Sequence, residues 1–197
     1  MDIIELLKNP IADLVVGMAF SLVLALVFYL KGKRDKEPHW SIQTVNLFKD
    51  YSGTVSGLDI QYLGEKVRDL WVSKIAFWNH GALTIDSDDL VPADRLRLET
   101  EGRGRILSTK LISTNNKASQ PLLSASLERD QAFLQFEYLD RGQGFVIQVI
   151  HEGTSSNDLD VKGAIKGVTR IRKIDLNEFI NKTKTGRRKH LFIQFTV

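Results

Sequence analysis

The chain contains two different patterns of apolar and polar positions. From Ile11 to Leu30 it reads IADLVVGMAFSLVLALVFYL, an apolar run with a single charged residue, Asp13. A helix of about 20 residues is about 30 Å long and matches the hydrocarbon core of a bilayer. From Trp40 onward, apolar and polar residues alternate with a period of two, which is typical of β-strands. The patterns predict a transmembrane helix over residues 10–30 and a β-rich domain after it.

A buried core helix and a cleaved signal peptide are the alternatives to a membrane span. Core helices are rarely this long and this uniformly apolar. A signal peptide begins with basic residues and ends in a small-residue cleavage site. Here residues 1–9 carry Asp2 and Glu5 against Lys8, and the charged sequence KGKRDK follows Leu30 directly. The sequence therefore favours a membrane span, with Pro10 in the first helical turn.

Basic residues lie unequally on the two sides of this run. Lys8 alone precedes it, whereas the residues that follow it include Lys31, Lys33, Arg34 and Lys36. The positive-inside rule then places the C-terminal side in the cytoplasm and the N-terminus outside. We expect a single-pass protein of the inner (plasma) membrane. Residues 1–9 would form a short amphipathic segment on its outer surface.

Small or polar residues recur at every fourth position of the apolar run: Asp13, Gly17, Ser21 and Ala25. Small residues at this spacing allow helices to approach closely, so the stripe predicts a homo-oligomer. In an oligomer, Asp13 would form an acidic ring and Ser21 a polar ring, which together suit a narrow cation pore. Two alternatives remain open: the stripe arises by chance, and Asp13 simply lies at the depth of the headgroups.

Residues 31–39 form a charged linker, and residues 40–197 form one cytosolic β-rich domain. Many short strands separated by turn signals predict an antiparallel β-sandwich or barrel. The expected strands are 41–48, 58–63, 70–78, 82–85, 95–99, 106–113, 122–127, 132–138, 144–151, 160–165, 169–174 and 191–197. One short C-terminal helix is expected from Asp175, where a capping-box spacing to Glu178 precedes the apolar Phe179 and Ile180.

Charge is concentrated near the C-terminus. The 197 residues contain 27 Lys and Arg against 24 Asp and Glu, a net charge of +3, but residues 151–197 alone hold ten basic and five acidic residues. The expected ligand-binding residues are Arg170, Arg172, Lys173, Lys184, Arg187, Arg188 and Lys189. Such a patch suits a phosphate-bearing ligand, a nucleotide or an oligonucleotide. It equally suits the anionic inner leaflet, and a merely solvated basic face is the third interpretation.

Signatures of catalysis are missing from the sequence. There is no nucleophile elbow, Walker loop, zinc-protease motif or dinucleotide-binding motif. The absence of cysteine excludes a disulfide scaffold and a thiolate metal site. The acidic group Asp86, Asp88 and Asp89 lacks the EF-hand pattern and is expected to be a solvated loop. We expect neither an enzyme nor a cofactor, and a pocket containing His151 and Glu152 would be needed to reverse this expectation.

A short outer segment, one span with the small-residue stripe, a basic junction and a cytosolic β domain follow one another. This layout resembles bacterial single-pass membrane effectors of anti-phage defence. The resemblance implies a sensor domain that binds a nucleotide or oligonucleotide and controls a membrane pore or channel. The alternative is a non-conducting anchored adaptor whose β domain binds a protein or anionic lipid. The segment Leu139–Gly153 (LDRGQGFVIQVIHEG) has the look of a family signature, with no function assigned to it.

Overall fold

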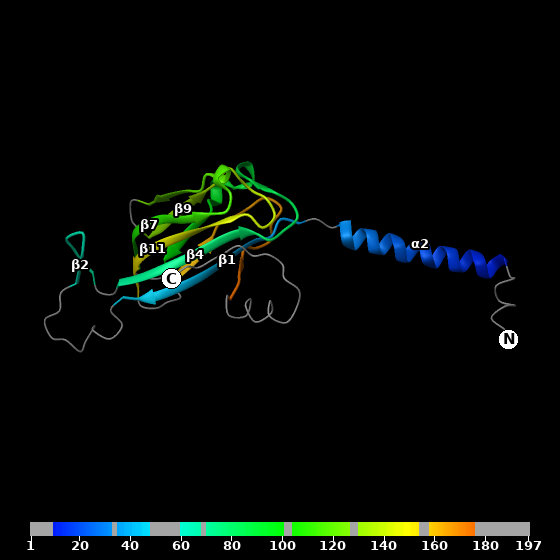
Figure 1. Ribbon diagram of the computed structural model, residues 1–197, viewed down its shortest axis with the longest axis horizontal. Coiled ribbons are helices and arrows are strands. Elements are labelled where there is room, and N and C mark those ends of the chain that lie inside the picture. The colour runs from blue at the N-terminus through cyan, green and yellow to red at the C-terminus, as the bar shows by residue number, and fades with distance from the viewer. Residues whose placement is uncertain are drawn as a thin grey trace. The chain divides into compact units, whose positions relative to one another are not determined.

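The computed structural model describes residues 10–32, 35–47, 60–67, 70–100, 104–126, 130–153 and 158–175. The chain divides into two units, Met1–Arg34 and Asp35–Val197 (Figure 1). The first unit contains helix α2 (Pro10–Gly32), and the second contains every strand that is described. The expected first segment, residues 1–9, lies outside the described residues, as do residues 176–197 with the rest of the expected C-terminal helix and the last strand.

Helix α2 confirms the expected helix and continues it two residues beyond residue 30. Its described side chains, Leu14–Tyr29, are all exposed. The hydroxyl of Ser21 donates to the carbonyl of Gly17 at 2.8 Å, within the helix. Across the described part of the chain, none of the helices has the length and apolarity that crossing a membrane requires.

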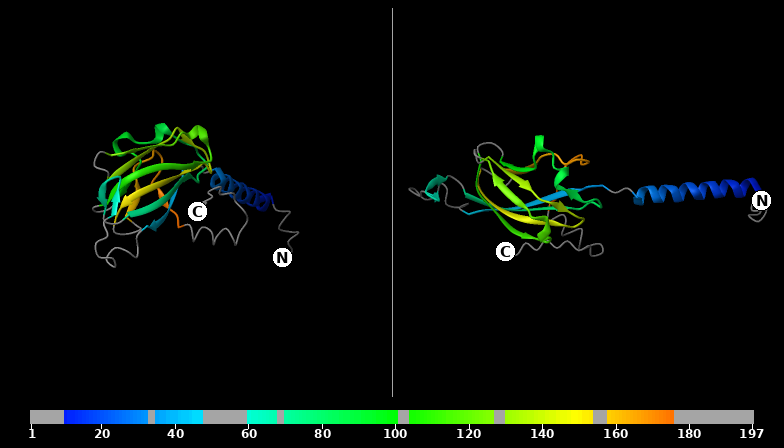
Figure 2. Two further views of the ribbon diagram at one scale, coloured as in Figure 1. Left: turned by 60° about the vertical axis from the view of Figure 1, so that its left-hand side comes forward. Right: turned by 90° about the horizontal axis from the view of Figure 1, so that it is seen from above.

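The second unit is built around two sheets (Figure 2). The five-stranded sheet has the order β13 (Arg172–Lys173), β1 (Pro38–Asn46), β4 (Leu70–Asn79), β11 (Gly144–Glu152) and β7 (Arg105–Thr114). The four-stranded sheet has the order β12 (Leu159–Lys162), β6 (Arg97–Thr100), β9 (Gln131–Gln135) and β8 (Leu122–Ala125). Two short pairs accompany them: β2 (Ile60–Tyr62) with β3 (Glu65–Val67), and β5 (Ile85–Asp86) with β10 (Tyr138–Leu139).

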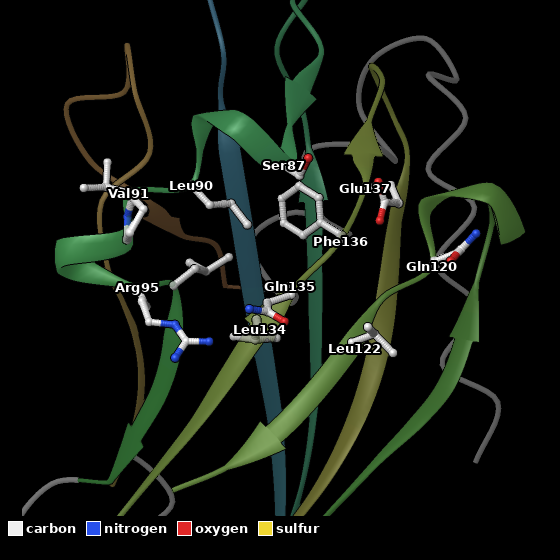
Figure 3. Close-up of a pocket in the computed structure, with 12 residues that line it drawn as sticks. Ser87, Leu90, Val91, Arg95, Gln120, Leu122, Leu134, Gln135, Phe136 and Glu137 are labelled. Carbon is white, nitrogen blue, oxygen red and sulfur yellow. The ribbon is translucent and has the colours of Figure 1, made fainter.

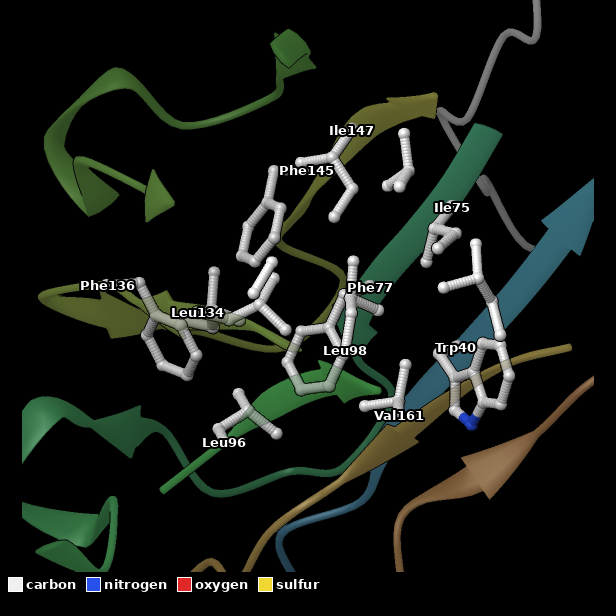
Figure 4. Close-up of a cluster of buried hydrophobic side chains, with 14 of the residues drawn as sticks. Trp40, Ile75, Phe77, Leu96, Leu98, Leu134, Phe136, Phe145, Ile147 and Val161 are labelled. Carbon is white, nitrogen blue, oxygen red and sulfur yellow. The ribbon is translucent and has the colours of Figure 1, made fainter. Parts of the chain in front are cut away.

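The main core lies between these two sheets (Figure 4). The five-stranded sheet contributes Trp40, Phe77 and Ile147, and the four-stranded sheet contributes Leu98 and Leu134. Alternate residues of each strand point into this layer because successive side chains of a strand face opposite sides. The two-layer arrangement corresponds to the sandwich alternative of the expected fold.

A smaller cluster covers part of the opposite face of the five-stranded sheet. Ala76, Trp78 and Val146 are buried there, and Ile174 packs against them. Strand β4 is therefore covered on both faces near its C-terminal end, which explains why five successive residues, from Ile75 to Asn79, are buried.

The mainly β class is confirmed, with differences in detail. Strands β4, β7 and β11 begin and end within one residue of the expected strands. Strand β1 begins three residues earlier than expected, at Pro38. One pairing differs in direction, because β13 runs parallel to β1, whereas the other described strand pairings are antiparallel. Only Arg172 and Lys173 of the expected strand 169–174 form this pairing.

Residues 35–37 are bonded to the β domain. The carbonyl of Asp35 accepts from the amides of Ala82 and Leu83, and the carbonyl of Glu37 accepts from the amide of His80. A side chain at Gly81 would collide with the Asp35 carbonyl oxygen, so the turn after β4 requires glycine at this close approach. Two of the residues expected in the linker, Asp35 and Glu37, are thus held by the β4–β5 turn.

Asn79 ties this segment to the rest of the domain. Its buried amide nitrogen donates to the carbonyls of Leu83 and Leu139, at 2.7 and 2.9 Å. Its side-chain oxygen accepts from the amides of Gly81 and Glu37, at 3.0 and 3.4 Å. The fully buried side chain of Asn79 therefore joins residues 35–37, the β4–β5 turn and β10.

Candidate functional site

A basic edge lies at the start of β1, formed by Arg170, Arg172 and Lys173. Strand β13 places Arg172 opposite His39 and Lys173 opposite Trp40. All three basic side chains are exposed, and the Lys173 ammonium lies 4.9 Å from the centre of the Trp40 ring, a cation–π contact. The other expected ligand-binding residues, Lys184, Arg187, Arg188 and Lys189, lie outside the described residues.

Two histidines extend this basic edge. The rings of His39 and His80 are stacked with their centroids 4.8 Å apart, and His39 also contacts the edge of Trp78 at 5.7 Å. His39 is buried while His80 is exposed. Burial, followed by the nearby charges of His80 and Arg172, lowers the pKa of His39 to about 4.

Buried polar atoms collect beside this histidine pair. His39 Nε2, Ser41 Oγ and Trp78 Nε1 are buried without a hydrogen-bond partner among the described residues. The register pairs His39 with Trp78 and Ser41 with Ala76, so all three side chains lie on the outer face of the five-stranded sheet. Buried polar groups are normally satisfied, so this cluster is unusual. These three atoms are closed to solvent, so the exposed side chains of the basic edge are the groups that a ligand would meet.

Sequence reasoning found part of this site and missed the rest. Arg170, Arg172 and Lys173 stand together in the sequence and were identified by their charge. His39, Ser41 and Trp78 come from β1 and β4, and only the strand register brings them together. His80 adjoins them because the β4–β5 turn is bonded to Glu37. The sequence carries no local signal for such a grouping.

The small-residue stripe of α2 lies on the surface of the helix. Gly17, Ser21 and Ala25 are all exposed, and a Cβ at Gly17 would meet no atom within 4 Å. The chain therefore leaves room for another molecule at this position. The side chain of Asp13 lies outside the described residues, so the proposed acidic ring stays a prediction.

The acidic group has a structural role. Asp89 forms a salt bridge with Lys36 at 2.5 Å, and its carboxylate also accepts from the amide of Asp86 at 2.8 Å. The neighbouring 3₁₀ turn η1 (Ser87–Asp89) is capped by this bond. Asp86 and Asp88 are exposed. The group therefore fastens residue 36 to the domain.

His151 belongs to a buried polar chain inside the sandwich. Its Nε2 lies 2.9 Å from Ser73 Oγ, which lies 2.8 Å from Thr44 Oγ1. Burial lowers the pKa of His151. His151 and Ser73 are fully buried, so these two groups face no solvent. Glu152 points elsewhere and binds Arg105 at 2.7 Å. The arrangement favours structure over catalysis.

The segment 139–153 contributes β11, which lies between β4 and β7 in the larger sheet. Its strand β11 pairs with β4 on one side and β7 on the other. Gly144 lies so close to Phe77 and Trp78 that a Cβ would collide with the Phe77 carbonyl. Packing thus accounts for the glycine at position 144.

A pocket of about 600 Å³ lies in a different part of the domain, and no sequence feature predicted it (Figure 3). It is lined by residues of η1, the turn η2 (Pro92–Asp94) and strands β8 and β9, together with neighbouring loop residues. These segments are far apart in the sequence, so no local motif marks the pocket.

Comparisons with protein-family models, curated proteins and solved structures find no match to this chain. The geometry of its own residues therefore carries the functional argument.

Proposed function

We propose that this chain is a membrane-anchored effector that binds an anionic ligand at its basic edge and acts as an oligomer. Helix α2 is the anchor, and the β domain is a binding module without catalytic activity. The observation that carries the proposal is the exposure of the apolar side chains of α2.

The composition of α2 supports the anchor. Side chains on every side of the helix are apolar and exposed, including Leu22, which is 72% exposed, and Phe28, which is 70% exposed. A helix that is apolar all round needs a bilayer or a protein interior around it. The described side chains cover Leu14–Tyr29. In the sequence the apolar run extends from Ile11 to Leu30, about 20 residues with the charged Asp13 near its start.

Two features of the basic edge support an anionic ligand: its nearness in the chain to α2, and the absence of salt bridges between its residues and the described carboxylates. Only residues 33–37 separate the end of α2 from Pro38, the first residue of β1. The basic edge is attached to that end of β1 through the pairing of Arg172 with His39. A phosphate-bearing ligand would meet Arg170, Arg172 and Lys173 without a described carboxylate bonded to any of them in a salt bridge.

The small-residue stripe supports oligomerisation and an output. Close packing at Gly17 would bring several α2 helices together, and ligand binding that favours one packing over another would open or close a cation pore. The second candidate is a non-conducting adaptor, which uses the same anchor and basic edge to recruit a protein or to hold anionic lipid.

A flotation experiment tests the anchor. The full chain is mixed with phosphatidylcholine vesicles, and we expect it to float with them. Leu22→Arg places a charge at the middle of α2, which costs about 3 kcal/mol in a bilayer, whereas Leu22→Phe is the matched apolar control. Loss of flotation in Leu22→Arg alone supports the anchor. A full chain that stays monodisperse in buffer and never floats contradicts it.

A charge-reversal experiment tests the ligand. Arg170, Arg172 and Lys173 are changed together to Glu, and the control changes the exposed Lys110, Lys117 and Lys166 to Glu, so both variants alter the net charge equally. Binding is measured to ATP, to a six-nucleotide RNA and to vesicles containing phosphatidylglycerol. A loss of at least tenfold in the first variant alone supports the basic edge, and the probe that binds identifies the ligand source. Equal losses in both variants contradict it.

Oligomerisation is tested at Gly17. Because a Cβ there meets nothing within the chain, any effect of Gly17→Leu on mass in detergent must come from another molecule. Val16→Leu, on a neighbouring face, is the control. Asp13→Asn should then leave the oligomer intact and lower cation flux into liposomes. An oligomer that passes no ions with or without the bound ligand would favour the adaptor over the pore.

A further inference from the structure

The pocket of about 600 Å³ has an apolar floor. Leu96, Leu134 and Phe136 form this floor and are themselves nearly fully buried, with exposed fractions of 1 to 3%. Leu90 and Val91 form one wall, and the strands contribute the opposite side (Figure 3). Pockets that hold small molecules are typically about 300–1,000 Å³ with such apolar linings. The size therefore suits a small molecule with an apolar body.

The rim of the pocket carries opposite charges on its two sides. Arg95 lies on the side of Val91, and Glu137 lies on the side of Gln120 (Figure 3). The Arg95 guanidinium lies 4.4 Å from the centre of the ring of Phe133, a residue outside the pocket lining. An anionic group would be attracted to Arg95 and repelled by Glu137. Such a rim would favour an anionic group on the Arg95 side.

The backbone of Gln120, which lines the pocket, has an unusual conformation. Its backbone is left-handed, with φ 42° and ψ 57°, at the end of the 3₁₀ turn η3 (Lys117–Ser119). This conformation favours glycine and costs most other residues about 1 kcal/mol. Gln120 nevertheless occupies the position, and its side chain lines the pocket. Left-handed residues commonly end helical turns, and strained non-glycine residues also cluster at binding sites.

From these observations we infer that the pocket binds a small amphipathic anion, with an aromatic or acyl body and one carboxylate. The body lies on Leu96, Leu134 and Phe136, and the carboxylate pairs with Arg95. Gln120 and Gln135 also line the pocket, and their amides would bind further polar groups of the ligand. Leu122, which is 64% exposed at the mouth, would be covered by the ligand. None of these residues belongs to the basic edge, so the inference is independent of the proposed function.

Calorimetric titration of the full chain tests the inference with 2-naphthoate as the probe. Its neutral analogue, 2-naphthamide, has the same body without the charge. We expect 2-naphthoate to bind at least tenfold more tightly, because a charge-assisted pair with Arg95 is worth more than a neutral hydrogen bond. Equal affinities for the two compounds, or no binding of 2-naphthoate, would overturn the inference.

Variants of the rim locate the binding. Arg95→Gln should weaken 2-naphthoate at least tenfold and leave 2-naphthamide unchanged, whereas Arg141→Gln, at an exposed turn, should change neither. Glu137→Gln should strengthen 2-naphthoate several-fold, because it removes a repulsion. A 2-naphthoate affinity that is the same in all three variants would place the probe elsewhere and overturn the inference.

Gln120→Gly separates binding from stability. If the strain is retained for the ligand, the variant should melt at a higher temperature and bind 2-naphthoate several-fold more weakly. Gln135→Ala, at a rim residue without left-handed backbone, should weaken binding without raising the melting temperature. A Gln120→Gly variant that melts lower, or that binds as tightly as the wild type, contradicts the role assigned to Gln120.

Discussion

Helix α2 and strand β4 are both rich in large apolar residues, yet their environments are opposite. The described side chains of α2 are all exposed, whereas β4 contains five successive buried residues, Ile75–Asn79. Strand β4 is covered by the second sheet on one face and by Val146 and Ile174 on the other. The comparison shows that apolar composition alone does not say what will cover a segment. The described residues of the chain cover β4, whereas they leave the described side chains of α2 exposed.

Removal of residues 1–34 should have the largest effect of the changes considered, an effect on solubility in buffer and not on stability. Because the described core lies entirely within the second unit, the fragment 35–197 should fold with the same thermal midpoint as the full chain and should require no detergent. Circular dichroism melts and sedimentation in buffer measure both properties. A fragment without a cooperative transition would mean that α2 supports the β core, and the contrast between the two elements would be lost.

Substitution of one phenylalanine in each element tests the difference in burial between β4 and α2. Phe77→Ala opens a cavity in the core, where Phe77 is 1% exposed, and should lower the free energy of unfolding by about 4 kcal/mol. Phe20→Ala in α2, where Phe20 is 64% exposed, should leave the unfolding of the β domain unchanged. Urea denaturation followed by tryptophan fluorescence measures both. Similar losses in the two variants would show that α2 packs on the domain.

Asn79→Leu should destabilise the β domain by about 3 kcal/mol. The variant keeps the approximate shape but leaves the carbonyls of Leu83 and Leu139 without the donor that they share. Asn115→Leu is the control, because Asn115 also makes two side-chain bonds to the backbone but is exposed. Its expected loss is about 1 kcal/mol. If urea denaturation shows equal losses of unfolding free energy in the two variants, Asn79 is not the residue that holds residues 35–37, the β4–β5 turn and β10 together.

The pH dependence of stability gives the smallest expected effect. The pKa of His39 is about 4 in the folded state, against an ordinary value of 6.5 for histidine, so the unfolded chain binds a proton more readily. Stability is therefore fully present above pH 6.5 and falls as the pH drops toward 4. Between pH 7 and pH 4.5 His39 should contribute a loss of about 2 kcal/mol.

His39→Gln tests this contribution. The difference in unfolding free energy between wild type and variant should change by that amount over the same pH range, with His80 and Arg172 left in place. The carboxylates of the domain titrate in both proteins, so they cancel in the difference. A difference that is independent of pH would mean that His39 is not held in its neutral form by burial and by these two neighbours.

Local periodicity predicted those parts of the fold that depend on neighbouring residues in the sequence. Strands β4 and β11 alternate clearly and were found within one residue of their bounds. Strand β3 was missed because Glu65 and Lys66 are both exposed, so it shows no alternation. The parallel pairing of β13 and the order of strands depend on contacts between distant segments, which no local period encodes.

The candidate sites were predictable to different degrees for the same reason. A charge count identified Arg170, Arg172 and Lys173 because they are adjacent in the sequence. The histidine pair requires the register of β1 with β4 and the bonding of the following turn. The left-handed conformation of Gln120 is invisible in the sequence, where glutamine gives no indication of a positive φ.

The attachment of residues 35–37 has a mechanical consequence. Tension applied through α2 would enter the β domain at Asp35, whose carbonyl is bonded to Ala82 and Leu83, and would then run along β1. Strand β1 is paired with β4 over nine residues, so a pull along the strand loads many hydrogen bonds in shear at once. The domain would resist such a load as one body, and a pull on α2 would reach the edge that carries His39 and Arg172.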